Sequence, residues 1–109
     1  MVALTVLLLA ACTTTPDEEA YVERPVGELY NHAMALIESG NYFRAAREFE
    51  EVGRQHPNST WATKDELMSA YSHYQINEYD EAIVSLDRYI QRHPSNPDAP
   101  YAYYLKGLC

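Results

Sequence analysis

The chain has 109 residues, a formal net charge of −8 at pH 7 and a pI near 4.8. This length allows one domain at most. The acidic balance argues against binding to nucleic acid, whose phosphates require clusters of Lys and Arg. It also argues against a polybasic contact with anionic lipids.

The chain opens with an apolar run over residues 2–11, which is too short to span a bilayer as a helix. An apolar stretch of this kind that ends in small side chains is typical of an export signal, so we expect a signal peptide over residues 1–11. The segment Leu9-Ala10-Ala11-Cys12 resembles the lipobox of bacterial lipoproteins. That resemblance implies a lipidated Cys12, and Thr13 after it implies sorting to the outer membrane. The alternative is a small buried thiol in a short apolar segment.

Residues 13–26, TTTPDEEAYVERPV, are polar and acidic and show no sustained period. Such a composition favours an extended segment over a packed one. We therefore expect residues 12–26 to form a lipidated cysteine with an acidic tether, and residues 27–109 to form the folded domain.

Beyond the tether the sequence repeats itself, with an offset of 37 residues from Tyr42 to Tyr79. At this offset Ala45 aligns with Ala82, Phe49 with Leu86, Val52 with Tyr89, and His56-Pro57 with His93-Pro94. The same shift places Ala33 on Ala70 and then on Gly107, all of them small residues suited to close helix crossings. A third unit has therefore begun when the sequence ends.

Each unit predicts two helices. Apolar residues recur at helical spacing in both segments of the second unit, at Leu67, Ala70, Tyr71 and Tyr74 and again at Tyr79, Ala82, Ile83, Leu86, Tyr89 and Ile90. Gly40 and Asn77 occupy the same turn and are the residue types that best tolerate a left-handed helix end. Pro57 and Pro94 predict where the second helices stop, and Asn96-Pro97 predicts the cap and first turn of the next helix. No segment alternates with the period of a strand, so we predict an all-α chain.

This pattern resembles the tetratricopeptide repeat, which has small and aromatic landmarks and a closing proline. The resemblance implies an α-solenoid of two repeats plus the first helix of a third. An unrelated array of αα-hairpins is the alternative.

Two further phrases, residues 87–97 (DRYIQRHPSNP) and 102–108 (AYYLKGL), follow the lipobox and tether. Together they resemble the lipid-anchored repeat proteins of the outer membrane β-barrel assembly machine. The resemblance implies a protein without catalytic activity or cofactor, lipid-anchored at the periplasmic face of the outer membrane. It also implies three kinds of partner: the barrel-forming subunit, other lipoproteins of the machine, and unfolded outer membrane proteins.

The chain departs from that family in length, because it ends within its fifth helix. We therefore expect an N-terminal fragment that lacks the partner-docking C-terminal repeats. The alternative function is a periplasmic tetratricopeptide-repeat adaptor for cell-division or peptidoglycan complexes.

In the repeat family, the first helix of each unit lines the concave surface. Alignment of the repeats then gives eight candidate peptide-binding residues: Tyr30, Met34, Ile37, Leu67, Tyr71, Tyr74, Tyr101 and Tyr104. A tyrosine-rich surface suits an extended chain, because the ring packs while the hydroxyl can bond to peptide backbone. The alternative for each single residue is packing between helices.

No pattern of a metal or catalytic site is present in the sequence. His56 and His93 recur before proline at equivalent positions, which favours a structural role, and no His-Glu-x-x-His segment occurs. No nucleophile arrangement or glycine-rich phosphate loop is suggested either, so we expect neither catalytic residues nor a bound metal. Arg44 and Arg47 precede Glu48 and Glu51 by four residues, a spacing that predicts solvated pairs along one helix.

Overall fold

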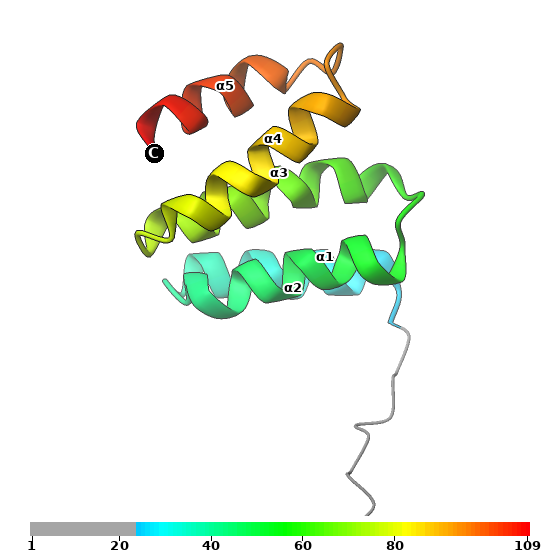
Figure 1. Cartoon of the computed structure of the whole chain (residues 1–109). Coiled ribbons are helices and arrows are strands. Elements are labelled where there is room, and N and C mark those ends of the chain that lie inside the picture. The colour runs from blue at the N-terminus through cyan, green and yellow to red at the C-terminus, as the bar shows by residue number, and fades with distance from the viewer. Residues whose placement is uncertain (1–23) are drawn as a thin grey trace, which may run out of the picture.

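The computed structural model describes residues 24–109, which form a stack of α-helices without a strand in this range (Figure 1). The helices are α1 (Val26–Glu38), α2 (Tyr42–Gln55), α3 (Thr60–Gln75), α4 (Tyr79–Arg92) and α5 (Ala99–Leu108). Each helix packs on the next in the sequence, and α1 also contacts α3. The predicted all-α architecture is confirmed. Cys12 and the expected signal peptide lie outside the described residues.

The turns within the two repeats have the same geometry. Gly40 has a φ of 77° and Asn77 a φ of 62°, so both adopt the left-handed conformation that the sequence predicts. In each turn the amide that follows bonds back over the helix end: Asn41 N to Leu36 O at 2.8 Å, and Glu78 N to His73 O at 2.9 Å. The closing bond therefore recurs at the repeat offset.

The second helices also end alike. The residue before each proline, His56 and His93, leaves the helix with φ near −130°. Its amide still bonds to the preceding turn, from His56 N to Val52 O and from His93 N to Tyr89 O, both at 2.8 Å. A residue before proline is disfavoured in the helical region. The stops predicted at Pro57 and Pro94 are confirmed.

The start predicted for the last helix is wrong by two residues. Helix α5 begins at Ala99 rather than at Pro97, and Asp98 precedes it as the capping residue without a side-chain bond. The carboxamide oxygen of Asn96 instead accepts a bond from Asp98 N at 2.9 Å. An asparagine that bonds two residues ahead in this way forms a turn, and that turn competes with capping the helix.

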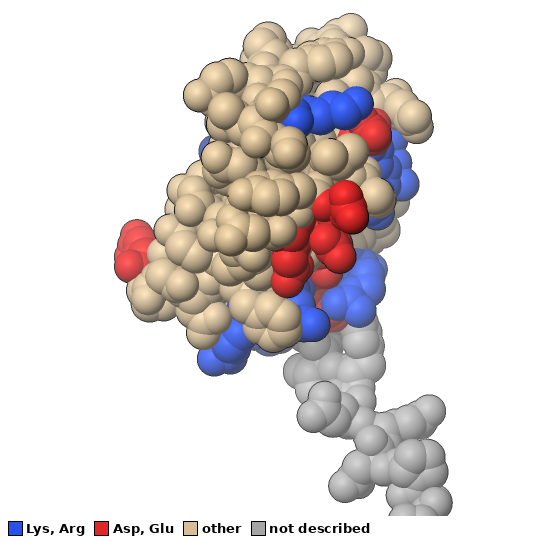
Figure 2. Space-filling model, turned by 60° about the vertical axis from the view of Figure 1, so that its left-hand side comes forward, with Lys and Arg blue, Asp and Glu red and all other residues tan. Residues whose placement is uncertain are grey.

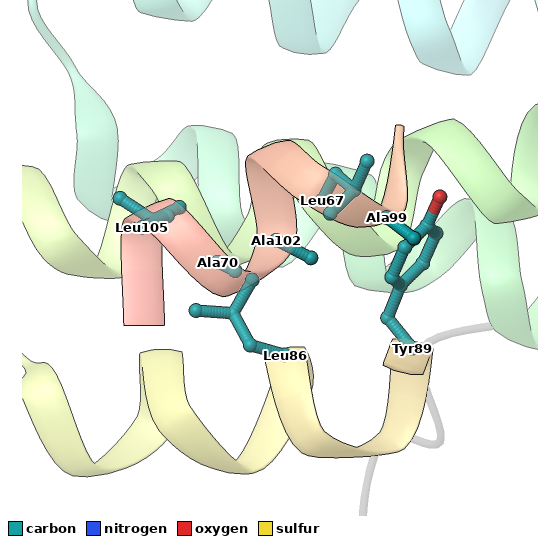
Figure 3. Close-up of a cluster of buried hydrophobic side chains, with 7 residues drawn as sticks. All are labelled: Leu67, Ala70, Leu86, Tyr89, Ala99, Ala102 and Leu105. Carbon is teal, nitrogen blue, oxygen red and sulfur yellow. The ribbon is translucent and has the colours of Figure 1, made fainter. Parts of the chain in front are cut away.

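Two clusters of buried side chains hold the stack together. One joins α1 to α2 through Ala33, Leu36, Ala45 and Phe49. The other joins α3, α4 and α5, and Figure 3 shows its members converging from these helices: Leu67, Ala70, Leu86, Tyr89, Ala99, Ala102 and Leu105. The aligned residues Ala33 and Ala70 are fully buried, as predicted for close crossings. Gly107, near the end of the last helix, is exposed.

Candidate functional site

The face formed by α1 and α3 carries a pair of aromatic rings. The ring centroids of Tyr30 and Trp61 lie 4.6 Å apart, and Trp61 is 39% exposed. On its other side Tyr30 meets the buried ring of Phe49 edge-on at 5.9 Å. Phe49 therefore supports Tyr30 from within the core, while Trp61 offers ring surface to solvent.

A second group of rings lies where α3 meets α5. Tyr101 is 41% and Tyr104 63% exposed, and Tyr71 is half-buried. Burial raises the pKa of the Tyr101 hydroxyl, and the nearby hydroxyls of Tyr71 and Tyr104 raise it further. Tyr71 also packs against the buried cluster that joins α3, α4 and α5. Tyr42 supports Tyr71 edge-on from α2, with centroids 6.2 Å apart.

We call Tyr30, Trp61, Tyr71, Tyr101 and Tyr104 the aromatic surface. Four of these residues are among the candidates that the repeat alignment predicts, and the structure gathers them into the two groups above. Trp61 was missed, because the equivalent positions in the other units are Arg24 and Asp98, so the alignment gives no signal for it. Its position at the start of a first helix, facing Tyr30, is a consequence of how α3 packs on α1.

The remaining predicted residues lie deeper in the molecule. Met34 and Ile37 are half-buried against the cluster between α1 and α2. Tyr74 packs on Tyr79 at the turn between α3 and α4, with centroids 5.9 Å apart. Leu67 is only 4% exposed within the cluster of Figure 3, so we assign it to the core and not to a binding surface.

Neither predicted pair forms, because Glu48 contacts Arg24 and His32, and Glu51 pairs with Arg54 instead of Arg47. Glu48 accepts a bond from Arg24 at 2.9 Å and pairs with His32 at 3.1 Å. Burial alone would raise the pKa of Glu48, but the bonds from His32 and Arg24 outweigh it and lower the pKa. Arg47 stacks on the ring of Phe43 instead, with its guanidinium carbon 3.8 Å from the ring centre.

Arg24 also fastens the start of the folded part to the end of α2. Its amide donates to the Gln55 side chain at 2.9 Å, and its carbonyl lies 2.7 Å from Nε2 of His56. Arg24, which we expect in the tether from sequence alone, is therefore held against the first repeat. The structural role expected for His56 is consistent with this contact.

His73 forms a bridge between the first and second repeats. Its two ring nitrogens lie 2.8 Å from a Glu50 oxygen and 2.7 Å from a Glu78 oxygen. The bond to Glu50 raises the pKa of His73 more than burial lowers it, and the bond to Glu78 raises it further. The charged bridge joins α2, α3 and the start of α4, and both acceptors are already occupied.

Residues 24–109 contain no group of three or more His, Cys, Asp or Glu side chains placed to hold a metal ion. Within the same residues, no helix has both the length and the apolar character needed to cross a membrane. The notable feature of the described structure is the aromatic surface, whose exposed rings lie on stacked helices. The fold and this surface define a helical-repeat scaffold with exposed aromatic rings.

Comparison with known proteins identifies the scaffold. The family model described as "Outer membrane lipoprotein" and called YfiO matches residues 22–109. The chain therefore belongs to the YfiO family of outer membrane lipoproteins.

Curated proteins similar to the chain include three named "Outer membrane protein assembly factor BamD". The one from Caulobacter vibrioides is 47% identical over 82% of this chain and 29% of its own length. Those from Rickettsia prowazekii and Neisseria meningitidis serogroup B are 39% and 37% identical, each over 94% of this chain and 40% of its own length. The chain thus spans less than half the length of these relatives.

Proposed function

We propose that this protein is a non-enzymatic factor in the assembly of outer membrane β-barrel proteins. In this role it binds unfolded barrel precursors on its aromatic surface and joins the barrel-forming subunit and other lipoproteins of the machine. The proposal is supported by its family and by the name of its relatives. The single observation that carries the binding role is the contact of the exposed Trp61 ring with Tyr30, together with the exposed rings of Tyr101 and Tyr104.

The chemistry of these rings fits an extended polypeptide. Strands of a transmembrane barrel alternate apolar and polar side chains, and aromatic girdles flank their apolar band. Exposed tyrosine and tryptophan rings can pack on such side chains, while their polar atoms bond to a backbone that has no strand partner yet. Aromatic residues also dominate the energetics of protein interfaces. One face of the scaffold could therefore hold many different precursors without reading one sequence.

The chain contains a single tryptophan, Trp61, which allows a direct binding test. A ten-residue peptide that alternates apolar and polar residues and ends in phenylalanine should change the fluorescence of Trp61 in a saturable way. Tyr104→Ser should weaken the binding by about 1–2 kcal/mol, the loss expected for an exposed aromatic anchor. Tyr103→Ser is the matched control, because Tyr103 is 59% exposed on the same helix but lies outside the aromatic surface. Equal effects of the two substitutions would contradict the assignment.

We also propose that Cys12 carries the lipid that anchors the protein to the periplasmic face of the outer membrane, at the end of the acidic tether. Several acyl chains are needed for durable anchoring, since one chain alone binds a bilayer marginally. In a diderm bacterial host fed with labelled palmitate, Cys12→Ser should abolish incorporation of the label. Cys109→Ser should leave it intact. Label that persists without Cys12 would refute this part of the proposal.

A further inference from the structure

A trough lies between α2 and α4, over α3, and on the other side of α3 from the aromatic surface. Two adjoining clefts form it, with Glu50, Ser85 and Arg88 common to both. At the end near the start of α4 it is lined by Phe43, Arg47, His73, Glu78, Asp80, Glu81 and Val84. At the other end it is lined chiefly by residues of α2, α3 and α4 that include Gly53, Arg54, Asp65, Glu66, Ser69 and Arg92.

Asp65 is the unusual member of this lining. It is 1% exposed, and neither of its carboxylate oxygens has a hydrogen-bond partner among the described residues. Burial of an unpaired carboxylate is costly, because lost hydration is not replaced. Both of its oxygens lie beneath the surface of the cleft, so a donor from outside the chain reaches them only when neighbouring side chains move.

The other charged side chains at this end of the trough have partners within the chain. Glu66 lies 3.7 Å from both Arg88 and Arg92. Arg54 pairs with Glu51 at 2.5 Å, and Glu50 is bonded to His73. Arg54 is thus matched by one carboxylate, whereas Arg88 and Arg92 share Glu66. Among the carboxylates that line this cleft, Asp65 is the one without a partner among the described residues.

The wall of the trough is open next to this residue. Gly53 lies inside α2, where glycine costs about 1 kcal/mol relative to alanine. No atom lies within 4 Å of the position that a Cβ on Gly53 would take. One repeat further on, the residues equivalent to Gly53 and Asp65 are Ile90 and Ala102, which share a packed apolar cluster. The first junction is hollow and polar where the second is filled.

The opposite end of the trough has the charge and the apolar surface expected for a basic peptide. Glu78, Asp80 and Glu81 line it, and Phe43 and Val84 leave 51% and 59% of their surface exposed beside them. Figure 2, in which the end of the molecule where α4 begins comes forward, shows acidic side chains gathered together with basic ones beside them. The whole chain is strongly acidic, with a net charge of −8. A basic partner is therefore attracted before it makes contact.

We propose that this trough binds a basic, extended segment of a protein partner, with one arginine side chain of that segment bonded to Asp65. A guanidinium presents parallel N–H donors in a fixed fork and can satisfy both oxygens of a carboxylate at once. The lysines or arginines that flank it meet Asp80 and Glu81. This second site is distinct from the aromatic surface and does not depend on the precursor-binding role proposed above.

The test uses the peptide acetyl-Lys-Leu-Lys-Gly-Arg-Gly-amide and the same peptide with neutral citrulline in place of arginine. Titration into the isotopically labelled protein, followed by amide chemical shifts, should move resonances of the trough-lining residues of α2, α3 and α4. Asp65→Asn should weaken the arginine peptide tenfold or more, because the bond to a charged group is lost, while leaving the citrulline peptide unchanged. Asp87→Asn is the matched control, since that carboxylate pairs with Lys106 of α5, away from the trough.

A second variant separates the loss of Asp65 from any change in folding. Gly53→Leu fills the open wall without displacing an atom near its Cβ and should block the arginine peptide. Three results would overturn the proposal: equal binding of the two peptides, binding that survives Asp65→Asn, or shifts confined to the aromatic surface. Tighter binding of an acidic peptide would also overturn it, by assigning the trough to the arginines at its rim.

Discussion

The junction between the first and second repeats differs from the junction between the second and third, although the same sequence pattern builds both. In the second junction Ala102 and Ile90 belong to a packed cluster with Leu67, Leu86 and Leu105. In the first junction the equivalent positions hold Asp65 and Gly53, and a carboxylate is buried without a partner among residues 24–109. The repeats can thus keep the same helices and turns even though one of their junctions has less apolar packing. Stability is held in the filled junction, and binding chemistry becomes available in the hollow one.

Introducing a carboxylate into the filled junction should have the largest effect on stability. Ala102 is 0% exposed, so Ala102→Asp places a carboxylate in the apolar cluster with no open wall beside it. We expect the free energy of unfolding to fall by about 4 kcal/mol or more at pH 8, since a buried unpaired charge costs several kcal/mol. Urea denaturation followed by circular dichroism measures the loss. Ala102→Ser, which adds a small neutral group, should cost clearly less, and equal losses would show that size and not charge decides.

Replacing the buried carboxylate of the hollow junction with an apolar side chain should stabilise the protein. Burial raises the pKa of Asp65 from 3.8 to about 7, so the folded state binds a proton that the unfolded chain releases. Stability contributed by a raised carboxyl pKa is present at low pH and is lost as the pH rises from about 4 to about 7. Asp65→Ala, which introduces the residue found at Ala102, should therefore raise the free energy of unfolding at pH 8 by roughly 2–4 kcal/mol.

The same substitution should also flatten the dependence of stability on pH between about 4 and 7. Glu66 and His73, whose pKa values are raised, and Glu50, whose pKa is lowered, remain in the variant and leave a residual slope. Denaturation midpoints measured across this pH range test the prediction. A slope that Asp65→Ala leaves unchanged would mean that Asp65 is ionised and solvated in the folded protein.

The His73 bridge should contribute less, and its contribution also falls as the pH rises. The bond to Glu50 first, and then that to Glu78, raises the pKa of His73 above its usual 6.5. The stability of such a histidine is fully present below pH 6.5 and is lost as the pH rises through the folded pKa. We expect His73→Gln to cost about 1 kcal/mol more at pH 6 than at pH 9. The same measurement on His32→Gln, whose single carboxylate contact is more exposed, serves as the control.

Filling the open wall in part should have the smallest effect. Gly53→Ala adds a methyl group within α2 where no atom lies within 4 Å. The substitution should raise the free energy of unfolding by about 0.5–1 kcal/mol, because glycine loses more backbone entropy in a helix than alanine. Gly107→Ala in α5 gives a second measurement of the same term outside the trough. Destabilisation by Gly53→Ala alone would indicate that the space beside α2 is needed in the folded protein.

Local features of this protein follow from its sequence by itself. The offset of 37 residues, the left-handed turns at Gly40 and Asn77 and the stops before Pro57 and Pro94 all appear in the structure. They could be predicted because each depends on a residue's own backbone preference or on apolar periodicity within a single helix. Four of the five residues of the aromatic surface were also candidates from the repeat alignment, although Leu67, which is equivalent to Tyr30 and Tyr104, is buried.

Only the tertiary structure decided which side chains meet across the helices. It turned Glu48 toward Arg24 and His32 and brought Trp61 against Tyr30. It also enclosed Asp65 without a donor from the described part of the chain, at a position where sequence spacing suggests only another helical residue. These outcomes depend on the distance and rotation between neighbouring helices. The spacing of residues within one helix does not determine either of them. The localisation signal and the helical scaffold thus follow from local sequence, whereas the arrangement of side chains in the trough depends on packing between helices.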